Sequence, residues 1–567
     1  MLMDRALPLT KFGAVKTALR IGWILLCLAL AFSARCWNVR DVFIQGHIYF
    51  VDGDCYSRMT RVRMVAEHPG TVVHHHDFEN WPEGVNSHTT APFDYLIVGL
   101  KPVLDAFFRW WDPMRQTVLH DQTLDLAGAL VSPLLGAAGV LFLGWWLARF
   151  RVRFGAATLL IYAISPILMH GTLLGRPDHQ SLLMLTITVA FGAELALAQG
   201  AGEMTGTDAK DGTNEKSVNV RAWGIVGGLA WALSLWVSLY EPLILLALVL
   251  LLWVLLDRRA LCSRQRLPGV YAFLAVIVVS LLIEGWPVSV PNAEVREYFP
   301  KWELTIGELS HLQLPLLFSW FGWCALAAPV LLLLMWRADR RVGAMLVVLL
   351  TLFLLTWWQV RWGYFLAIAY AWTLPWQLQV LRRAWVAVPL FIVGLWPVLK
   401  DWDGRLFPNE IGQEQQSVQH GEMVGLRNLV TSAIGSRGGP FLASWWLSPS
   451  IAYWSRQPGV GGTSHESLPG IVDSARFFLS TDPKSAAAIL RKRGVHWVLA
   501  DDPGRALSTS SVLLGVAPSE NALAVTLFDK PEEAPDFLHE WKGIGALNEE
   551  GLRFYRLYEV DNAKLPP

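Results

Sequence analysis

The sequence predicts a polytopic α-helical membrane protein of about 11–13 transmembrane helices with a C-terminal extracytoplasmic α/β domain. Three observations carry this prediction. Of the 567 residues, 53% are hydrophobic and only 17% are charged, whereas roughly 25% are charged in an average soluble domain. The mean hydropathy is +0.36. Long apolar runs recur up to residue 400, as helices need in order to cross the hydrocarbon layer of a bilayer.

The expected spans follow these runs in order along the chain. They cover residues 15–35, 122–148, 155–172, 181–199, 222–238, 241–257, 268–286, 313–336, 342–358, 363–379 and 384–399. The run from 222 to 257 is too long for one span, and Tyr240, Glu241 and Pro242 lie in its middle. These three residues predict a tight turn between two membrane helices.

Basic residues predict which ends of the spans face the cytoplasm. They cluster in alternate connections, as the positive-inside rule requires of the cytoplasmic side. The clusters are the amino terminus, Arg149 to Arg153, Lys210 to Arg221, Arg258 to Arg266, Arg337 to Arg341, and Arg382 with Arg383. We therefore expect a multi-pass protein of the inner (plasma) membrane, in contact with the lipid bilayer, whose long loops at 36–121 and 287–312 face the periplasm.

Composition divides the chain near residue 400. Residues 1–400 form the expected transmembrane domain, and residues 401–567 have the composition of a soluble periplasmic domain. Within this second domain, residues 484–493 predict a helix that ends before Gly494, and residues 495–500 predict a strand. This helix–turn–strand unit favours a small α/β domain outside the membrane.

Charge and motifs exclude several classes of protein. The chain carries 47 Lys+Arg against 47 Asp+Glu, which excludes a nucleic-acid binder with a basic face, and we expect no nucleic-acid partner. It has no phosphate-binding loop or dinucleotide fingerprint, so an ATP-driven pump is not expected. Cys36 and Cys55 both fall on the outer side, where a disulfide is permitted, but two cysteines do not define one.

Four polar residues on the expected outer face are candidates for chemistry. They are Asp54 after the first span, Asp178 between the third and fourth, Glu308 before the eighth, and Arg361 after the ninth. Carboxylate oxygens suit magnesium or manganese, which in turn bind pyrophosphate oxygens. Such an ion stabilises a leaving diphosphate as a Lewis acid, and an arginine grips phosphate through two hydrogen bonds. The alternative for each residue is a solvated loop charge.

Short motifs surround these four residues. They are Asp54-Cys55-Tyr56 with Arg58 and Arg61, Trp81-Pro82-Glu83-Gly84, Gly175 to Gln180, Thr305-Ile306-Gly307-Glu308, and Gln359-Val360-Arg361. In their order and sidedness they resemble the catalytic subunit of oligosaccharyltransferase, a class C membrane glycosyltransferase. The resemblance covers most of the chain, from the first span into the outer domain.

The resemblance implies that a glycan moves from a polyprenyl-diphosphate donor to a protein acceptor, at an asparagine by analogy. Asp54, Asp178 and Glu308 would then hold the divalent metal, magnesium or manganese. Asp54 and Glu308 would also contact the acceptor nitrogen, and Arg361 would bind the pyrophosphate of the donor. His179 and Gln180, which follow Asp178, would contact the metal ligands without binding the metal themselves.

Two places depart from the family pattern. Gln180 replaces an acidic residue and keeps a carbonyl oxygen without its charge. Trp445, Trp446 and Leu447 occupy the place of the family's Trp-Trp-Asp-Tyr-Gly motif. In the family that aspartate accepts a hydrogen bond from the Ser/Thr hydroxyl of the acceptor, which Leu447 is unable to do. The sequence therefore predicts the donor chemistry and leaves the acceptor rule open.

Three other functions stay open at this point. A related glycosyltransferase would use an acceptor without a sequon, such as a hydroxyl of a protein, a lipid or a polysaccharide. A lipid-linked sugar transporter needs polar residues along its spans, and these spans are nearly free of charge. An inactive scaffold would be a degenerate relative, as the two lost acidic positions allow.

Overall fold

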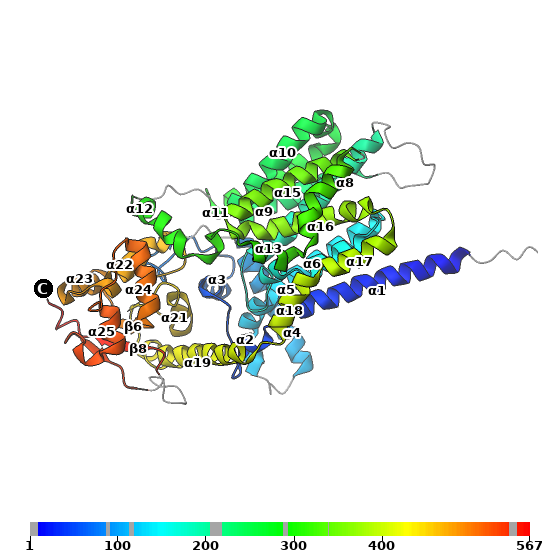
Figure 1. Ribbon diagram of the computed structural model, residues 1–567. Helices are drawn as coiled ribbons and strands as arrows, with labels where there is room; N and C mark the ends of the chain where they lie inside the picture. Colours follow the sequence, from blue (N-terminus) through cyan, green and yellow to red (C-terminus); the bar gives the residue numbers. More distant parts are fainter. Residues whose placement is uncertain are drawn as a thin grey trace, which may run out of the picture.

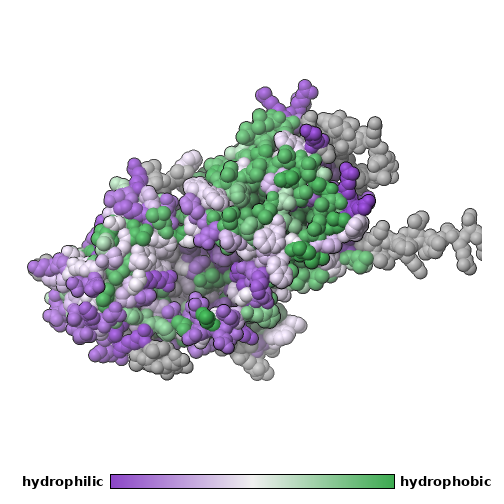
Figure 2. All heavy atoms as spheres, in the orientation of Figure 1, coloured by the Kyte–Doolittle hydropathy of each residue, from purple (hydrophilic) through white to green (hydrophobic). Residues whose placement is uncertain are grey.

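The computed structural model describes residues 9–86, 91–112, 118–204, 218–286, 293–337, 339–543 and 553–566. Two parts are visible in Figure 1: a bundle of helices, here the bundle part (residues 9–406), and a smaller C-terminal part (residues 410–566) that contains a four-stranded sheet. Hydrophobic side chains cover the visible surface of the bundle, and hydrophilic ones dominate that of the C-terminal part (Figure 2). The predicted helical membrane fold with a C-terminal α/β part is confirmed.

The bundle part is almost wholly helical. Its helices are α1 (Leu9–Arg35), α2 (Val39–Val42), α3 (Gly53–Glu67), α4 (Ala91–Trp111), α5 (Thr123–Arg149), α6 (Gly155–Ile164), α7 (Pro166–His170), α8 (Gln180–Met204), α9 (Val220–Val237), α10 (Tyr240–Leu261), α11 (Leu267–Glu284), α12 (Ala293–Trp302), α13 (Leu314–Phe321), α14 (Cys324–Trp336), α15 (Arg340–Trp358), α16 (Gly363–Val380), α17 (Ala384–Gly394) and α18 (Trp396–Leu406). Within the described ranges, seven helices are long and apolar enough to cross a membrane, or nine if the bent pairs α13–α14 and α17–α18 each form one span.

This count is lower than predicted, although every expected span contains a helix. Helices α6 and α7 divide the expected span at 155–172, because Pro166 lacks the backbone N–H of a continuous helix. Helix α16 covers the expected span at 363–379, and most of its side chains are buried against other helices. A helix enclosed by protein tolerates polar side chains such as the buried Gln377, which donates to Thr373 Oγ1 at 2.9 Å. Helix α18 runs through the expected domain boundary at residue 400.

Glycines bring helices α9 and α11 into direct backbone contact. A Cβ atom on Gly228 would lie 2.1 Å from the carbonyl oxygen of Gly269, and one on Gly269 would lie 2.2 Å from that of Gly224. Such small-residue crossings are typical of membrane helices, where close packing drives association. Helix α9 also packs on α8, so the crossing fixes the helix that begins immediately after Asp178.

Short elements connect the helices of the bundle part. They are the strand pairs β1 (Phe43–Ile44) with β2 (His47–Ile48) and β3 (His75–His76) with β4 (Val85–Asn86), and the 3-10 turns η3 (Glu303–Thr305), η4 (Gly307–Leu309) and η5 (Val360–Trp362). Cys36 and Cys55, whose pairing the sequence left open, are both free. Two of these turns carry candidate residues, Glu308 in η4 and Arg361 in η5.

The C-terminal part is an α/β unit. Its elements are α19 (Glu410–Ser432), α20 (Ile434–Arg437), β5 (Phe441–Leu442), α21 (Ser448–Ser455), α22 (Leu468–Leu479), α23 (Pro483–Arg493), β6 (Trp497–Ala500), α24 (Pro503–Leu514), α25 (Leu523–Asp529), β7 (Leu538–Glu540) and β8 (Arg556–Val560). The sheet order is β5-β6-β8-β7, with β5 parallel to β6 and the other pairs antiparallel. Helix α23 and strand β6 match the helix and strand expected at 484–493 and 495–500.

Buried polar contacts hold the C-terminal part against the bundle part. The Arg493 side chain is 1% exposed and pairs with Glu83 in the first outer loop. Its Nη1 also donates to the Trp81 carbonyl oxygen at 3.0 Å. The Tyr453 hydroxyl donates to Asp125 Oδ1 at 2.5 Å. The C-terminal part therefore lies against the first outer loop and the start of α5.

Candidate functional site

A pocket of about 550 Å³ lies where the two parts meet. Known small-molecule sites enclose roughly 300–1,000 Å³. Its lining comes from residues 52–54, 166–176, 302–308, 360–364 and 445–463, which are far apart in the sequence. Asp54, Glu308 and Arg361 line it, and Asp178 lies 3.7 Å from the guanidinium of the lining residue Arg176. The fold thus brings all four candidates to one place.

Asp54 lies in the first turn of α3 and lines the pocket. Asp52 caps this helix, because its side chain accepts a hydrogen bond from a first-turn backbone N–H at 3.0 Å. Gly53 lets the C-terminal part approach, since a Cβ atom there would lie 2.8 Å from Thr463 Cγ2. Enclosure by protein and then the charge of Asp52 raise the pKa of Asp54 to about 7, although a hydrogen bond with Thr463 lowers it in part.

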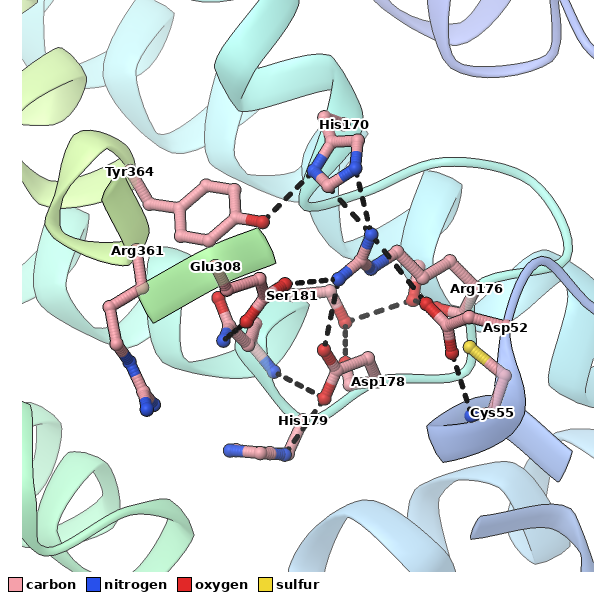
Figure 3. A network of polar contacts seen from close by, with 12 residues as sticks. Asp52, Cys55, His170, Arg176, Asp178, His179, Ser181, Glu308, Arg361 and Tyr364 are labelled. Carbon is pink, nitrogen blue, oxygen red and sulfur yellow. Dashed lines mark hydrogen bonds and ion pairs between the residues drawn. The ribbon is translucent and has the colours of Figure 1, made fainter. Parts of the chain in front are cut away.

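The turn between α7 and α8 positions Arg176 in the middle of the acidic residues. Gly175 has a φ of +73°, and its N–H donates to the Ala129 carbonyl oxygen at 3.0 Å. From this turn the Arg176 side chain, 6% exposed, reaches Glu308 Oε1 at 2.7 Å through Nη2 and Asp52 Oδ2 at 3.8 Å through Nη1 (Figure 3). One buried cation therefore joins three chain segments.

Asp178 and its two neighbours support the same network. His179 Nδ1 lies 2.8 Å from Asp178 Oδ1, and Gln180 Nε2 donates to Glu308 Oε2 at 3.5 Å. Burial acts to raise the pKa of Asp178, but the interactions with His179, including a hydrogen bond, and the charge of Arg176 outweigh it and hold this pKa well below its ordinary value. His179 and Gln180 thus contact the acidic candidates, as residues of a supporting role would.

Glu308 is held on a loop that is tied to the Arg361 segment. The Val360 N–H donates to the Ser310 carbonyl oxygen at 2.9 Å, and the Leu312 N–H donates to that of Trp357 at 3.4 Å. These backbone bonds join η4 to η5, which is why the two candidates share one pocket although about fifty residues separate them. The loop begins after residues 287–292, which lie outside the described ranges.

Arg361 is paired with Glu241 at the start of α10. Glu241 is 2% exposed, and the Ser238 hydroxyl donates to its Oε2 at 2.6 Å. Although burial acts to lower the pKa of Arg361, Glu241 and Glu308 raise it above its ordinary value. Glu241 therefore fixes the direction of the guanidinium and keeps it charged.

Three tryptophans also line the pocket, and they are here called the indole wall (Trp302, Trp445 and Trp446). The rings of Trp302 and Trp445 meet edge to face with centroids 5.9 Å apart. Their two indole N–H groups are buried and have no hydrogen-bond partner among the described residues. Leu447 does not line the pocket and packs instead into an apolar cluster that includes Leu426.

The donor set suits a divalent cation, although the side chains are not arranged as a metal site. Asp52, Asp54, Asp178 and Glu308 offer hard carboxylate oxygens, and all but Asp54 contact the buried Arg176. In the part of the chain that the structure describes, no three His, Cys, Asp or Glu side chains are grouped closely enough to hold an ion. The carboxylates fit a divalent metal in their chemistry and charge, and Arg176 lies among them. We call these four acids, Arg176 and Arg361 the charged wall.

Asp52, Arg176 and Glu241 belong to this site and were not predicted from the sequence. Arg176 lies inside the segment Gly175 to Gln180, where no role was predicted for it, and Glu241 was predicted to lie in a turn beside Pro242. An arginine two positions before a candidate ligand, and a carboxylate at the outer end of a span, were the signals available. Only the fold shows that these side chains meet Glu308 and Arg361.

Comparison with known proteins gives the fold. No family model and no curated protein matches the sequence. Among solved structures, the Archaeoglobus fulgidus oligosaccharyltransferase AglB in complex with an inhibitory peptide and a dolichol-phosphate matches with a TM-score of 0.64 at 13% identity, over 97% of this chain and 75% of that one. The same enzyme tethered to an acceptor peptide with an NVT sequon matches with a TM-score of 0.63 at 15% sequence identity, over 96% of this chain and 74% of that one.

A second kind of enzyme shares the architecture. Apo ArnT from Cupriavidus metallidurans matches with a TM-score of 0.51 at 15% identity, over 96% of this chain and 99% of that one. The fold expected from the sequence motifs is thereby confirmed at low sequence identity. This chain has the oligosaccharyltransferase-like fold of the class C membrane glycosyltransferases.

Proposed function

We propose that this protein moves a glycan from a polyprenyl-diphosphate donor to a protein acceptor, at an asparagine by analogy with the oligosaccharyltransferases. One observation carries the proposal: Asp54, Asp178, Glu308 and Arg361, from four distant segments, meet at one pocket in a fold shared with AglB. The pocket would face the periplasm. Helix α5 supports this orientation, since its first turn contacts the C-terminal part through Asp125, and its last turn carries Arg149 of a basic cluster.

Arg361 would bind the pyrophosphate of the donor. Its guanidinium lines the pocket and is oriented by the buried Glu241. Bidentate arginine contacts are suited to phosphate oxygens. The apolar side chains of Ile167, Leu316 and Trp320 line the same pocket and would accommodate the first part of the lipid.

The carboxylates would serve the transfer step. The acceptor nitrogen forms a bond to the anomeric carbon while the bond from that carbon to the diphosphate oxygen breaks, and polyprenyl diphosphate leaves. Asp54 or Glu308 orients the acceptor amide and takes up its proton, as a carboxylate within hydrogen-bond reach of that amide can. A divalent ion, magnesium or manganese, held by Asp54, Asp178 and Glu308, would stabilise the diphosphate charge as a Lewis acid.

Leu447 favours a second candidate, in which the acceptor follows no sequon. The residue packs among apolar side chains and is absent from the pocket lining. A hydroxyl of a protein, a lipid or a polysaccharide would then attack the anomeric carbon in place of the amide. Mass spectrometry of periplasmic glycopeptides, with and without the gene, separates the two candidates.

Alanine variants test the proposed roles. Asp54→Ala, Asp178→Ala and Glu308→Ala should each reduce transfer by about 10³-fold or more in membranes supplied with donor and Mn²⁺, because each removes a charge on which the transition state depends. Asp121→Ala is the matched control, since this side chain is 83% exposed on the same outer face. Undiminished transfer by any two of the three variants would contradict the proposal.

A further inference from the structure

Arg176 occupies the position in the pocket where the proposed cation would be expected. Its Nη2 lies 2.7 Å from Glu308 Oε1 and 3.7 Å from Asp178 Oδ2, and both carboxylates are proposed metal ligands. Figure 3 shows the guanidinium pointing into the group of acidic side chains. A divalent ion bound to the same oxygens would lie next to a positive charge, and like charges at this distance repel strongly.

The other arginines near these acids have partners of their own. Arg361 pairs with Glu241, and Arg58 Nη1 pairs with Asp94 Oδ1 at 2.9 Å. Arg176 is the arginine in direct contact with Asp52, Asp178 and Glu308 among the described ion pairs, and His179 lies beside Asp178. The charged wall keeps an excess of negative charge that still attracts a cation.

Arg176 has a second contact, His170, that does not depend on Glu308. Its Nη1 already lies 3.0 Å from His170 Nε2, and His170 Nδ1 lies 2.9 Å from the Tyr364 hydroxyl. Its Nε has no hydrogen-bond partner within the described ranges. His170, Tyr364 and Arg176 all line the pocket, so the guanidinium borders its open space.

We infer that Arg176 is a built-in counter-ion that competes with the divalent cation for the oxygens of Glu308 and Asp178. Without the cation, Arg176 holds the three acidic segments together. When the cation binds, Arg176 is displaced towards the pocket. This inference rests on the metal site of the proposed function, and it is tested by metal binding alone, without donor, acceptor or transfer.

The first test is a Mn²⁺ titration of the purified full chain, with free Mn²⁺ measured by electron paramagnetic resonance. Arg176→Gln should lower the Kd for Mn²⁺ by at least about tenfold, because it removes the competing charge and keeps a polar side chain. Arg176→Lys, which keeps the charge, should stay nearer to the wild-type value. Arg405→Gln is the matched control, because Arg405 lines the same pocket but pairs with Asp401 on its own helix. The Kd of this variant for Mn²⁺ should differ from that of the wild type by less than about threefold.

An unchanged or higher Kd in folded Arg176→Gln protein would overturn the inference, as would the absence of Mn²⁺ binding to both the wild type and this variant.

The second test needs no variant. Phenylglyoxal labelling of the wild-type protein, measured by peptide mass spectrometry, should modify Arg176 at least about threefold more at saturating Mn²⁺ than in EDTA, because a displaced guanidinium is accessible. Equal or lower labelling of Arg176 would contradict displacement, and Arg405 reports any general change in access.

Discussion

The charged wall and the indole wall of the pocket differ in the kind of polar group that they carry. On the charged wall, Arg176 contacts three carboxylates, and Arg361 is oriented by the buried Glu241. On the indole wall, two indole N–H groups have no partner among the described residues. Next to this wall, Leu447 is packed away from the pocket.

Under the proposed function, this difference would separate donor chemistry from acceptor recognition. Buried ion-pair networks are costly to assemble and are destabilising when half broken, so the charged wall tolerates little change. The indole wall offers aromatic surface and no carboxylate, which recognises shape more than a particular hydroxyl. We therefore expect donor use to respond steeply to substitutions and acceptor use to respond weakly.

The largest effect within this comparison is expected at Arg361. Arg361→Gln should raise the apparent KM for the lipid-linked donor by about 100-fold, with a smaller change in kcat, because a charged contact to the pyrophosphate is lost. Donor titrations in the transfer assay measure this. An unchanged KM for the donor would remove Arg361 from the phosphate site and weaken the contrast between the walls.

A smaller effect is expected at Glu241, which acts through Arg361. Glu241→Gln should raise the KM for the donor by about tenfold, since Arg361 keeps its charge but loses its orienting partner. Combined with Arg361→Gln, it should add little, because two residues of one network are not additive. Full additivity in this double-mutant cycle would show that Glu241 does not act through Arg361.

Substitutions of Leu447 test the packing next to the indole wall, and the readout is the stability of the protein. Leu447→Asp should destabilise the protein by about 2 kcal/mol, because it places a carboxylate in an apolar cluster without a partner, and the apparent Tm should fall. Leu447→Met is the volume-matched control and should cost less than about 1.5 kcal/mol. A gain of transfer to Asn-X-Thr peptides in Leu447→Asp would instead show that this position faces the acceptor.

The smallest effect is expected at Trp445. Its indole N–H is shielded from solvent and lacks a partner, so Trp445→Phe removes no hydrogen bond and should change the KM for the acceptor by less than about twofold. Acceptor titrations at saturating donor check this. A tenfold rise would mean that the indole N–H donates to the acceptor, and the two walls would then be equally specific.

The sequence predicted the helices well, for physical reasons, and it pointed to three acidic residues that the structure brings to one pocket. Apolar runs are local, so each expected span contains a helix, and the Pro166 break was the local feature given too little weight. Asp54, Asp178 and Glu308 lie in short motifs that can be seen without the fold. Whether these side chains bind a metal stays a prediction.

Partner choice was the part that the sequence did not reveal. Arg176 pairs with Glu308 across 132 positions, and Arg361 pairs with Glu241 across 120. No periodicity or spacing encodes such pairs, because they depend on which loops meet at the outer face. Helix α16 was similarly expected as an ordinary span, and its central position emerges only from how the bundle packs.

The most direct test of the central claim uses one purified polyprenyl-diphosphate-linked glycan and the purified protein with Mn²⁺. The measurement is release of polyprenyl diphosphate across a panel of sequon peptides, hydroxyl-bearing peptides, lipids and polysaccharides. The wild type should release it with at least one acceptor class, and Asp54→Ala and Glu308→Ala should release none above background. No release by the wild type with any acceptor, or equal release by both variants, would contradict the assignment of this pocket to glycan transfer.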